Sequence, residues 1–209
     1  MPQPSHPIGI FDSGVGGLSV LREIRALLPH ENLIYLGDQA HAPYGPRGKE
    51  ELQRLTEAII QFLLKKEIKL LVIACNTASA AALKAMRLRF PDLPIVGMEP
   101  AVKPAAHQTQ SGKVGVLATP STFAGELYAS VVERFASGVE VFESSCPGLV
   151  SQIEKGELDA PLTRQILSDA IEPMLAKGAD TLVLGCTHYP FVLEQIQAIT
   201  GPELTIIDP

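Results

Sequence analysis

The feature that most constrains this chain is a repeated segment that ends in a cysteine. Residues 69–79 read KLLVIACNTAS and residues 180–190 read DTLVLGCTHYP. A gapless alignment pairs Cys75 with Cys186, Asn76 with Thr187 and Thr77 with His188. Each copy is a short apolar run followed by polar residues, and this pattern favours a strand covered on both faces. If the two copies face each other, two thiols approach one space from opposite sides, and that geometry suits moving a proton from one face of a carbon to the other.

A second pair of segments repeats in the same order. Residues 113–118 (KVGVLA) resemble residues 7–12 (PIGIFD), and Thr119 falls opposite Ser13. The distance from Ser13 to Cys75 is 62 residues, and that from Thr119 to Cys186 is 67 residues. Two repeats at similar spacing predict two related lobes, residues 1–98 and residues 99–209. Prolines at 100 and 104 punctuate the chain near this boundary, which we place within residues 98–104.

Alternating strand-like and helix-like segments predict the fold class. Strands are expected at 8–12, 33–37, 95–97 and in the run that ends at Cys75; helices are expected at 17–28, 49–66 and 78–90. Helix 49–66 has the clearest apolar stripe: Leu52, Leu55, Ile59, Phe62 and Leu63. Such alternation is typical of α/β proteins with parallel sheets. We therefore expect two similar lobes, each a mostly parallel sheet flanked by helices, related by a pseudo-twofold axis with the site in the cleft between them.

Composition and charge disfavour several classes of protein. The net charge is −6 and the basic residues are scattered, which argues against a nucleic-acid-binding protein. There is no apolar run of membrane-spanning length, and the amino terminus does not read as a secretory signal. Three cysteines without a C-x-x-C spacing argue against a disulfide framework or a zinc ribbon. These observations predict a soluble, cytoplasmic protein with reduced thiols.

A glycine-rich turn, DSGVGG at residues 12–17, follows the first predicted strand. Glycines there permit a tight turn, and the next helix start offers free N–H groups to an anion. A dinucleotide-binding fingerprint would need a third glycine where Ser19 stands, and the sequence contains no P-loop motif. A glycine turn without any ligand is the structural alternative.

The paired cysteines are the strongest candidates for chemistry. A thiol at a strand end and helix start can have a lowered pKa, because the helix dipole favours the thiolate. A lone cysteine is more often a small buried apolar residue, and Cys146, which has no counterpart, is interpreted in this way. Asp12 and His188 could exchange protons with a thiol or a substrate, although a turn-capping aspartate and a structural histidine are the alternatives. A metal site is disfavoured, since Cys186 and His188 have no convincing further ligands.

Short polar residues cluster where the predicted strands end. This set comprises Ser13, Asn76, Thr77, Thr119 and Thr187, and the loop Pro43–Gly45 reaches the same edge. Open α/β sheets bind ligands at the carboxyl ends of their strands. Hydroxyl, amide and backbone N–H groups there would hold the carboxylates and the ammonium of a small amino acid. Taken singly, each of these residues is more often a helix cap.

Taken together, four motifs resemble those of the glutamate racemase family. They are FDSGVGG (11–17), PYG (43–45), ACNTA (74–78) and GCTHYP (185–190), and they occur in the family's order over essentially the whole chain. Aspartate racemases share the two-cysteine plan but have a different opening glycine motif. An aspartate racemase and a non-catalytic dicarboxylate-binding module are the alternatives.

The resemblance implies specific roles for residues. Cys75 and Cys186 would be the two acid/base groups, assisted by Asp12, His188 and Glu154. Substrate contacts would come from Asp12, Ser13, Pro43, Tyr44, Gly45, Asn76, Thr77, Thr119, Thr122, Thr187 and His188. The resemblance further implies no pyridoxal phosphate and no metal, a cytoplasmic homodimer, and D-glutamate supply for peptidoglycan. Relatives continue beyond the position of Pro209, so we expect the first lobe to lack a returning helix.

Overall fold

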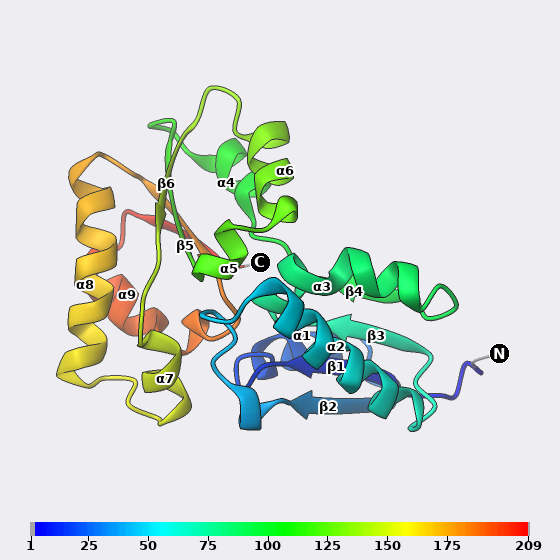
Figure 1. Ribbon diagram of the computed structural model, residues 1–209. Coiled ribbons are helices and arrows are strands. Elements are labelled where there is room, and N and C mark those ends of the chain that lie inside the picture. Colours follow the sequence, from blue (N-terminus) through cyan, green and yellow to red (C-terminus); the bar gives the residue numbers. More distant parts are fainter. Residues whose placement is uncertain (1–2, 209) are drawn as a thin grey trace.

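The computed structural model of the protein describes residues 3–208. Met1, Pro2 and Pro209 lie outside the described residues. The predicted start of the first lobe at residue 1, the predicted end of the second lobe at residue 209 and the expected lack of a returning helix therefore lie outside them too. The described chain forms two four-stranded parallel sheets, each flanked by helices (Figure 1). The predicted fold class is therefore confirmed.

The two sheets have the same strand order. The first contains β1 (Ile8–Asp12), β2 (Leu33–Gly37), β3 (Leu70–Ile73) and β4 (Ile95–Gly97) in the order β2-β1-β3-β4. The second contains β5 (Lys113–Ala118), β6 (Glu140–Ser144), β7 (Thr181–Gly185) and β8 (Thr205–Ile207) in the order β6-β5-β7-β8. Strand β1 thus corresponds to β5, and β3 to β7, so each repeated segment occupies the same position in its sheet.

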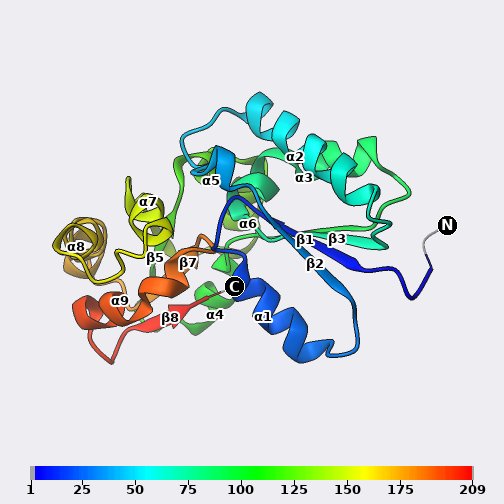
Figure 2. The same cartoon turned by 90° about the horizontal axis from the view of Figure 1, so that it is seen from below.

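Helices cover both faces of the first sheet. They are α1 (Leu18–Leu27), α2 (Lys49–Leu64) and α3 (Asn76–Arg89), and a short 3-10 turn, η1 (Gln39–His41), follows β2. Helices α2 and α3 lie on one side of the sheet and α1 lies on the other (Figure 2). Buried aliphatic side chains such as Ile60, Leu71 and Met86 fill the α2–α3 side. Burial of such side chains stabilises the lobe by roughly 1.5–3 kcal/mol each.

The second sheet is covered in the same way. Its helices are α4 (Val102–Gln108), α5 (Pro120–Phe123), α6 (Glu126–Phe135), α7 (Leu149–Glu154), α8 (Pro161–Ala176) and α9 (Leu193–Thr200), with the 3-10 turn η2 (Tyr189–Val192) before α9. Helices α8 and α9 lie on one face, and α4 and α6 lie on the other (Figures 1 and 2). Val102 and Ala105 of α4 are buried against this sheet. The lobe boundary after residue 98 stays a prediction.

Several details differ from the predicted elements. Strand β3 ends at Ile73 rather than at Cys75, because Cys75 is already the N-cap of α3, and helix α2 ends at Leu64 rather than at residue 66. Phe62 is 48% exposed, so the prediction that it belongs to the buried apolar stripe of α2 was wrong. The buried face of α2 is centred on Leu52, Thr56 and Ile59, and the 100° step per residue turns Phe62 about a quarter of a circle away from it. Helix α3 begins at Asn76 rather than Ala78, because the sulfur of Cys75 caps it by accepting a hydrogen bond from the Ala78 N–H at 3.4 Å.

Within residues 3–208, no helix is both long enough and apolar enough to cross a lipid bilayer.

Candidate active site

The carboxyl ends of the central strands of both sheets meet where the two lobes touch. Thr187, just after β7, donates a hydrogen bond from its hydroxyl to Oδ1 of Asp12 at the end of β1, at 3.0 Å. The hydroxyl of Thr77, in the first turn of α3, lies 2.8 Å from the hydroxyl of Thr119, just after β5. Residues of the two repeats are therefore in direct contact across the lobe junction.

The thiol of Cys75 is buried at the end of this first repeat. Cys75 is 4% exposed, and its sulfur lies 3.8 Å from the hydroxyl oxygen of Ser13. Burial, reinforced by the nearby charge of Asp12, raises the pKa of Cys75 to about 12. The prediction that the helix dipole lowers this pKa was wrong, because desolvation of the thiolate outweighs the hydrogen bond from the helix N-terminus.

Cys186 follows β7 and is the first member of a chain of polar contacts. Its sulfur lies 3.8 Å from Nδ1 of His188, and Nε2 of His188 lies 2.5 Å from Oε1 of Glu154. Cys186 and His188 are 7% and 1% exposed. Burial raises the pKa of Cys186 well above its usual value, and the charge of Cys75 raises it further. Cys75, Cys146 and Cys186 all carry free thiols, so the two repeat cysteines are not joined to each other.

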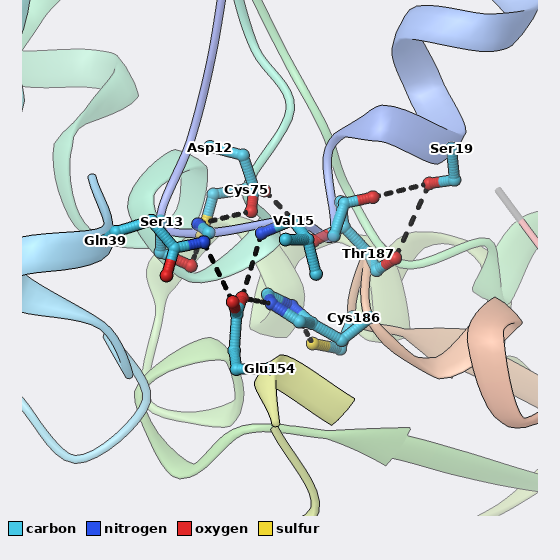
Figure 3. Close-up of polar contacts among 12 residues, drawn as sticks. Asp12, Ser13, Val15, Ser19, Gln39, Cys75, Glu154, Cys186 and Thr187 are labelled. Atoms are coloured by element: carbon cyan, nitrogen blue, oxygen red, sulfur yellow. Dashed lines mark hydrogen bonds and ion pairs between the residues drawn. The ribbon is translucent and has the colours of Figure 1, made fainter. Parts of the chain in front are cut away.

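Glu154 reaches from the last turn of α7 to the first lobe. Its Oε1 accepts the backbone N–H of Val15 at 2.9 Å, and its Oε2 accepts the side-chain amide of Gln39 at 2.8 Å. Figure 3 shows the Glu154 carboxylate directed at these two groups. Burial acts to raise the pKa of Glu154, but the hydrogen bonds from His188, Gln39 and Val15 outweigh burial and lower the pKa below its usual value. Glu154 is therefore a carboxylate when it contacts His188.

Asp12 is fully buried at the lobe junction. Its Oδ2 accepts the backbone N–H of Gly14 at 3.0 Å, while its Oδ1 accepts the Thr187 hydroxyl. Burial raises the pKa of Asp12, because removal of water disfavours the carboxylate more than these hydrogen bonds and the charge of His188 favour it. A raised pKa makes Asp12 a group that can carry a proton near Cys75.

The glycines of the turn make room for the opposite lobe. A Cβ on Gly14 would overlap the carboxylate of Glu154, and a Cβ on Gly16 would lie 2.5 Å from both Nδ1 of His188 and Oγ1 of Thr187. Neither glycine has a positive φ, so the backbone itself would accept another residue. The turn therefore needs glycine because side chains of the second lobe lie directly against it.

Hydroxyl groups from both lobes form a buried cluster on the other side of the site. The hydroxyl of Thr119 lies 2.8 Å from that of Thr77 and 3.0 Å from that of Thr122. Asn76, which precedes Thr77, is 3% exposed, and its Oδ1 has no hydrogen-bond partner among the described residues. An amide oxygen without a partner and three hydroxyls are suited to an ammonium and a carboxylate.

The loop after β2 is fixed by its own side chains. Tyr44 is 1% exposed, donates its hydroxyl to Oδ2 of Asp38 at 2.7 Å and packs its ring near Phe11. Carbonyl oxygens of Gly45 and Arg47 accept a hydrogen bond from the hydroxyl of a second-lobe residue, Ser121.

Two cavities lie near the predicted site residues. Pro43 and Gly45 line a cavity of about 270 Å³ with Thr119, Cys146 and Tyr189. A second cavity, of about 440 Å³, is lined by Asn76, Cys186 and Thr187 and by side chains of α1. Cys75 is not among the lining residues of either cavity.

The sequence reasoning missed three residues of this arrangement. Gln39 binds Glu154, Asp38 binds Tyr44, and Tyr35 donates its hydroxyl to the carbonyl oxygen of Gly14 at 2.5 Å. Asp38 and Gln39 follow β2, the neighbour of β1, so their position at the same edge of the sheet could have identified them.

Cys146 is buried, in agreement with its interpretation as a small apolar core residue. Among residues 3–208, no group of three or more His, Cys, Asp or Glu side chains could hold a metal ion.

Comparison with known proteins decides the family. A family model described as Asp/Glu/hydantoin racemase matches residues 8–209. The chain belongs to this racemase family. Within the family, a glutamate racemase of Roseiflexus sp. is 56% identical over 206 residues, which cover 99% of this chain and 76% of that protein. A glutamate racemase of Pseudomonas aeruginosa is 52% identical over 208 residues, which cover 100% of this chain and 78% of that protein. The resemblance predicted from the four motifs is thus confirmed, and the chain is placed among the amino-acid isomerases.

Solved structures of the racemase family support the same conclusion. Glutamate racemase isoform RacE1 of Bacillus anthracis has a TM-score of 0.88 and 37% identity, covering 99% of this chain and 77% of that one. Escherichia coli glutamate racemase, solved with L-glutamate and the activator UDP-MurNAc-Ala, has a TM-score of 0.87 and 36% identity, covering 97% and 77%. The Picrophilus torridus aspartate racemase, with a TM-score of 0.56 and 18% identity over 97% of this chain and 87% of that one, shares the fold.

Proposed function

We propose that this protein interconverts L- and D-glutamate by a two-base reaction in which Cys75 and Cys186 act on opposite faces of the α-carbon. The observation that carries the proposal is the placement of the two repeat cysteines. Each follows the corresponding strand of its sheet, each is a buried free thiol, and polar residues of the two lobes are in contact around them. The names of the similar proteins support glutamate as the substrate.

In the proposed reaction, one cysteine acts as a thiolate and removes the α-proton, and the electron pair of the C–H bond stays on the substrate. The thiol of the other cysteine then donates its proton to the opposite face of the carbanion, and the new C–H bond inverts the stereocentre. The first cysteine ends as a thiol and the second as a thiolate, so the reverse reaction uses the same groups with exchanged roles. No cofactor takes part in either step.

The neighbours of each thiol support its proton transfers. Asp12 and Ser13 assist Cys75, and His188 with Glu154 assists Cys186. Burial raises the pKa of both thiols, and a bound substrate brings a positive ammonium group, which lowers the pKa of nearby thiols. General acid–base catalysis contributes about 10²–10⁴-fold, so most of the acceleration must come from positioning and from polar groups arranged around the developing charge.

The remaining predicted residues would bind the substrate. Side-chain groups of Ser13, Asn76, Thr77, Thr119, Thr122 and Thr187 supply hydroxyls and amides. The hydroxyl of Tyr44 is already bonded to Asp38, so the loop Pro43–Gly45 contributes backbone groups. A homodimer, a cytoplasmic location and D-glutamate supply for peptidoglycan complete the proposal, and they are supported by the family resemblance.

Hydrogen exchange in D₂O tests the proposed function. The protein is incubated with L-glutamate in D₂O, and the α-hydrogen is followed by proton NMR together with the loss of optical rotation. We expect deuterium at the α-carbon and racemic glutamate. Binding without exchange would show a non-catalytic dicarboxylate-binding protein, and faster exchange with aspartate than with glutamate would make aspartate the substrate.

A further inference from the structure

Glu154 and the first lobe form a contact that none of the predicted roles accounts for. Three residues of the first lobe surround the Glu154 carboxylate. Gly14 has no side chain and so leaves room for the carboxylate, Val15 donates its backbone N–H to it, and Gln39 donates its side-chain amide. We call these three residues the carboxylate socket. Glu154 itself, together with His188 and Cys186, belongs to the second lobe.

We propose that the carboxylate socket positions Glu154 against His188, so that the contacts Cys186–His188–Glu154 are completed only when the two lobes are together. This inference rests on the proposed function, because it assigns Gln39, Gly14 and Val15 as positioning residues for the second thiol. None of the three touches either reacting sulfur through a contact found in this structure, and each acts through Glu154.

The hydrogen bonds of Glu154 support this coupling. One oxygen, Oε1, is shared between Val15 and His188, at 2.9 and 2.5 Å, while the other binds Gln39 at 2.8 Å. The two first-lobe donors therefore fix both the position and the rotation of the carboxylate. The Glu154 side chain is 13% exposed and the His188 side chain is 2% exposed, so water competes poorly for the contact between them, whereas Gln39 holds the other carboxylate oxygen from the exposed side. Without the socket, the carboxylate would be free to turn away from His188.

Gly14 provides independent support. Its φ lies outside the left-handed region, so an alanine is compatible with the backbone at this position. The three heavy atoms that a Cβ on Gly14 would meet first all belong to the Glu154 carboxyl group. The approach of Glu154 therefore explains why position 14 carries no side chain.

A double-mutant cycle tests the contact between Gly14 and Glu154. We expect Gly14→Ala to lower the urea midpoint of unfolding, and we expect Glu154→Ala to remove most of that loss in the double variant. An equal loss from Gly14→Ala with and without Glu154 would overturn the proposed socket. This measurement needs no catalytic activity, so it remains informative even if the protein fails to exchange the α-hydrogen of glutamate.

The role of Gln39 is tested by the state of His188. Gln39→Leu keeps the side-chain size and removes the amide donor. The control Gln165→Leu removes an equivalent donor, which binds Asp169 on the exposed face of α8. We expect Gln39→Leu to shift the ring ¹⁵N resonances of His188, which are assigned by their absence from the spectrum of His188→Asn. We also expect Gln39→Leu to lower kcat/KM about tenfold, which corresponds to the lower end of the free energy of a hydrogen bond to a charged group.

The control separates positioning from general destabilisation. Gln165→Leu should leave both the His188 resonances and kcat/KM at wild-type values. Unchanged His188 resonances in Gln39→Leu would overturn the assignment, whatever the effect on rate. If wild type fails to exchange the α-hydrogen while Gln39→Leu still shifts His188, the proposed function fails and the socket stands.

Discussion

The hydroxyl of Thr187 donates a hydrogen bond to the carboxylate of Asp12 at 3.0 Å, although 175 positions separate the two residues. Thr187 directly follows Cys186, and Asp12 is close enough to Cys75 for its charge to raise the pKa of that thiol. One hydrogen bond thus connects the surroundings of both proposed acid/base groups. A change on either side of the lobe junction is expected to affect the other side.

Replacement of either repeat cysteine by serine is expected to abolish racemisation. A serine hydroxyl is a far weaker acid than a thiol, so kcat/KM should fall by at least about 10²-fold, the lower range of general acid–base catalysis. L- and D-glutamate have equal free energy, so kcat/KM must fall by the same factor in both directions. Circular dichroism of glutamate solutions measures both rates.

A substrate analogue with a leaving group distinguishes the two cysteines. Loss of the leaving group needs only proton removal, so Cys75→Ser and Cys186→Ser should each process one enantiomer of the analogue and spare the other. Cys146→Ala is the matched control, because Cys146 has no counterpart in the repeat and no proposed role in proton transfer, so this variant should still racemise glutamate in both directions. Wild-type racemisation by Cys186→Ser would refute the two-base assignment.

Removal of the charge on Asp12 is expected to lower the pKa of Cys75. Burial raises this pKa to about 12, and the Asp12 carboxylate adds to the effect by disfavouring a second negative charge nearby. In Asp12→Asn the electrostatic contribution is lost, so the thiolate should form at lower pH. The pH dependence of the alkylation rate of the native protein, with Cys186 and Cys146 replaced by alanine, measures the shift. An unchanged profile would show that Asp12 does not act on this thiol.

Loss of the Thr119 hydroxyl is expected to weaken substrate binding. Thr119 contacts the hydroxyls of Thr77 and Thr122, and valine has the same shape without a hydrogen-bonding group. If this cluster holds a substrate carboxylate, Thr119→Val should raise KM about tenfold, since a hydrogen bond to a charged group contributes roughly 1.5–3 kcal/mol. Thr119→Ser restores the hydroxyl and should recover most of the affinity. Equal KM values for the serine and valine variants would exclude a role for the hydroxyl.

Asp180 is expected to stabilise the second lobe in a pH-dependent way. Its carboxylate accepts hydrogen bonds from the hydroxyl of Thr109 and from the N–H groups of Gln110 and Ser111, at 2.6, 2.8 and 2.6 Å. Burial acts to raise the pKa of Asp180, but these hydrogen bonds dominate and hold the pKa well below its usual value of 3.8. The contribution to stability is therefore complete above about pH 4, near the unfolded pKa, and is lost as the pH falls toward the folded pKa.

Asp180→Asn tests this dependence. The variant keeps one acceptor oxygen and loses the charge, so the free energy of unfolding at pH 7 should fall by about 1–2 kcal/mol, with partial exposure reducing the effect. Urea denaturation at pH 7 and at about pH 3 should show the difference from wild type shrinking at the lower pH. A difference of the same size at both values would contradict the charge-based explanation.

The apolar patterns of this chain were sufficient to predict several of its strands, although β6 was missed and β3 ends two residues before Cys75. The segments 8–12, 33–37 and 95–97 form strands with the predicted limits. The first of them is buried at every position, as expected for a short apolar run within a covered sheet. The repeat also predicted matching positions for Cys75 and Cys186. Local sequence carries this information, since strand limits and the order of motifs are properties of neighbouring residues.

Tertiary structure decided the properties that depend on burial and on distant residues. The high pKa of Cys75 follows from the loss of water, which the helix-start pattern alone could not show. The need for glycine at position 14 comes from Glu154, and the contact between Glu154 and Gln39 joins residues 115 positions apart. A sequence shows which groups are present at each strand end, but desolvation and contact between lobes exist only after the chain has folded.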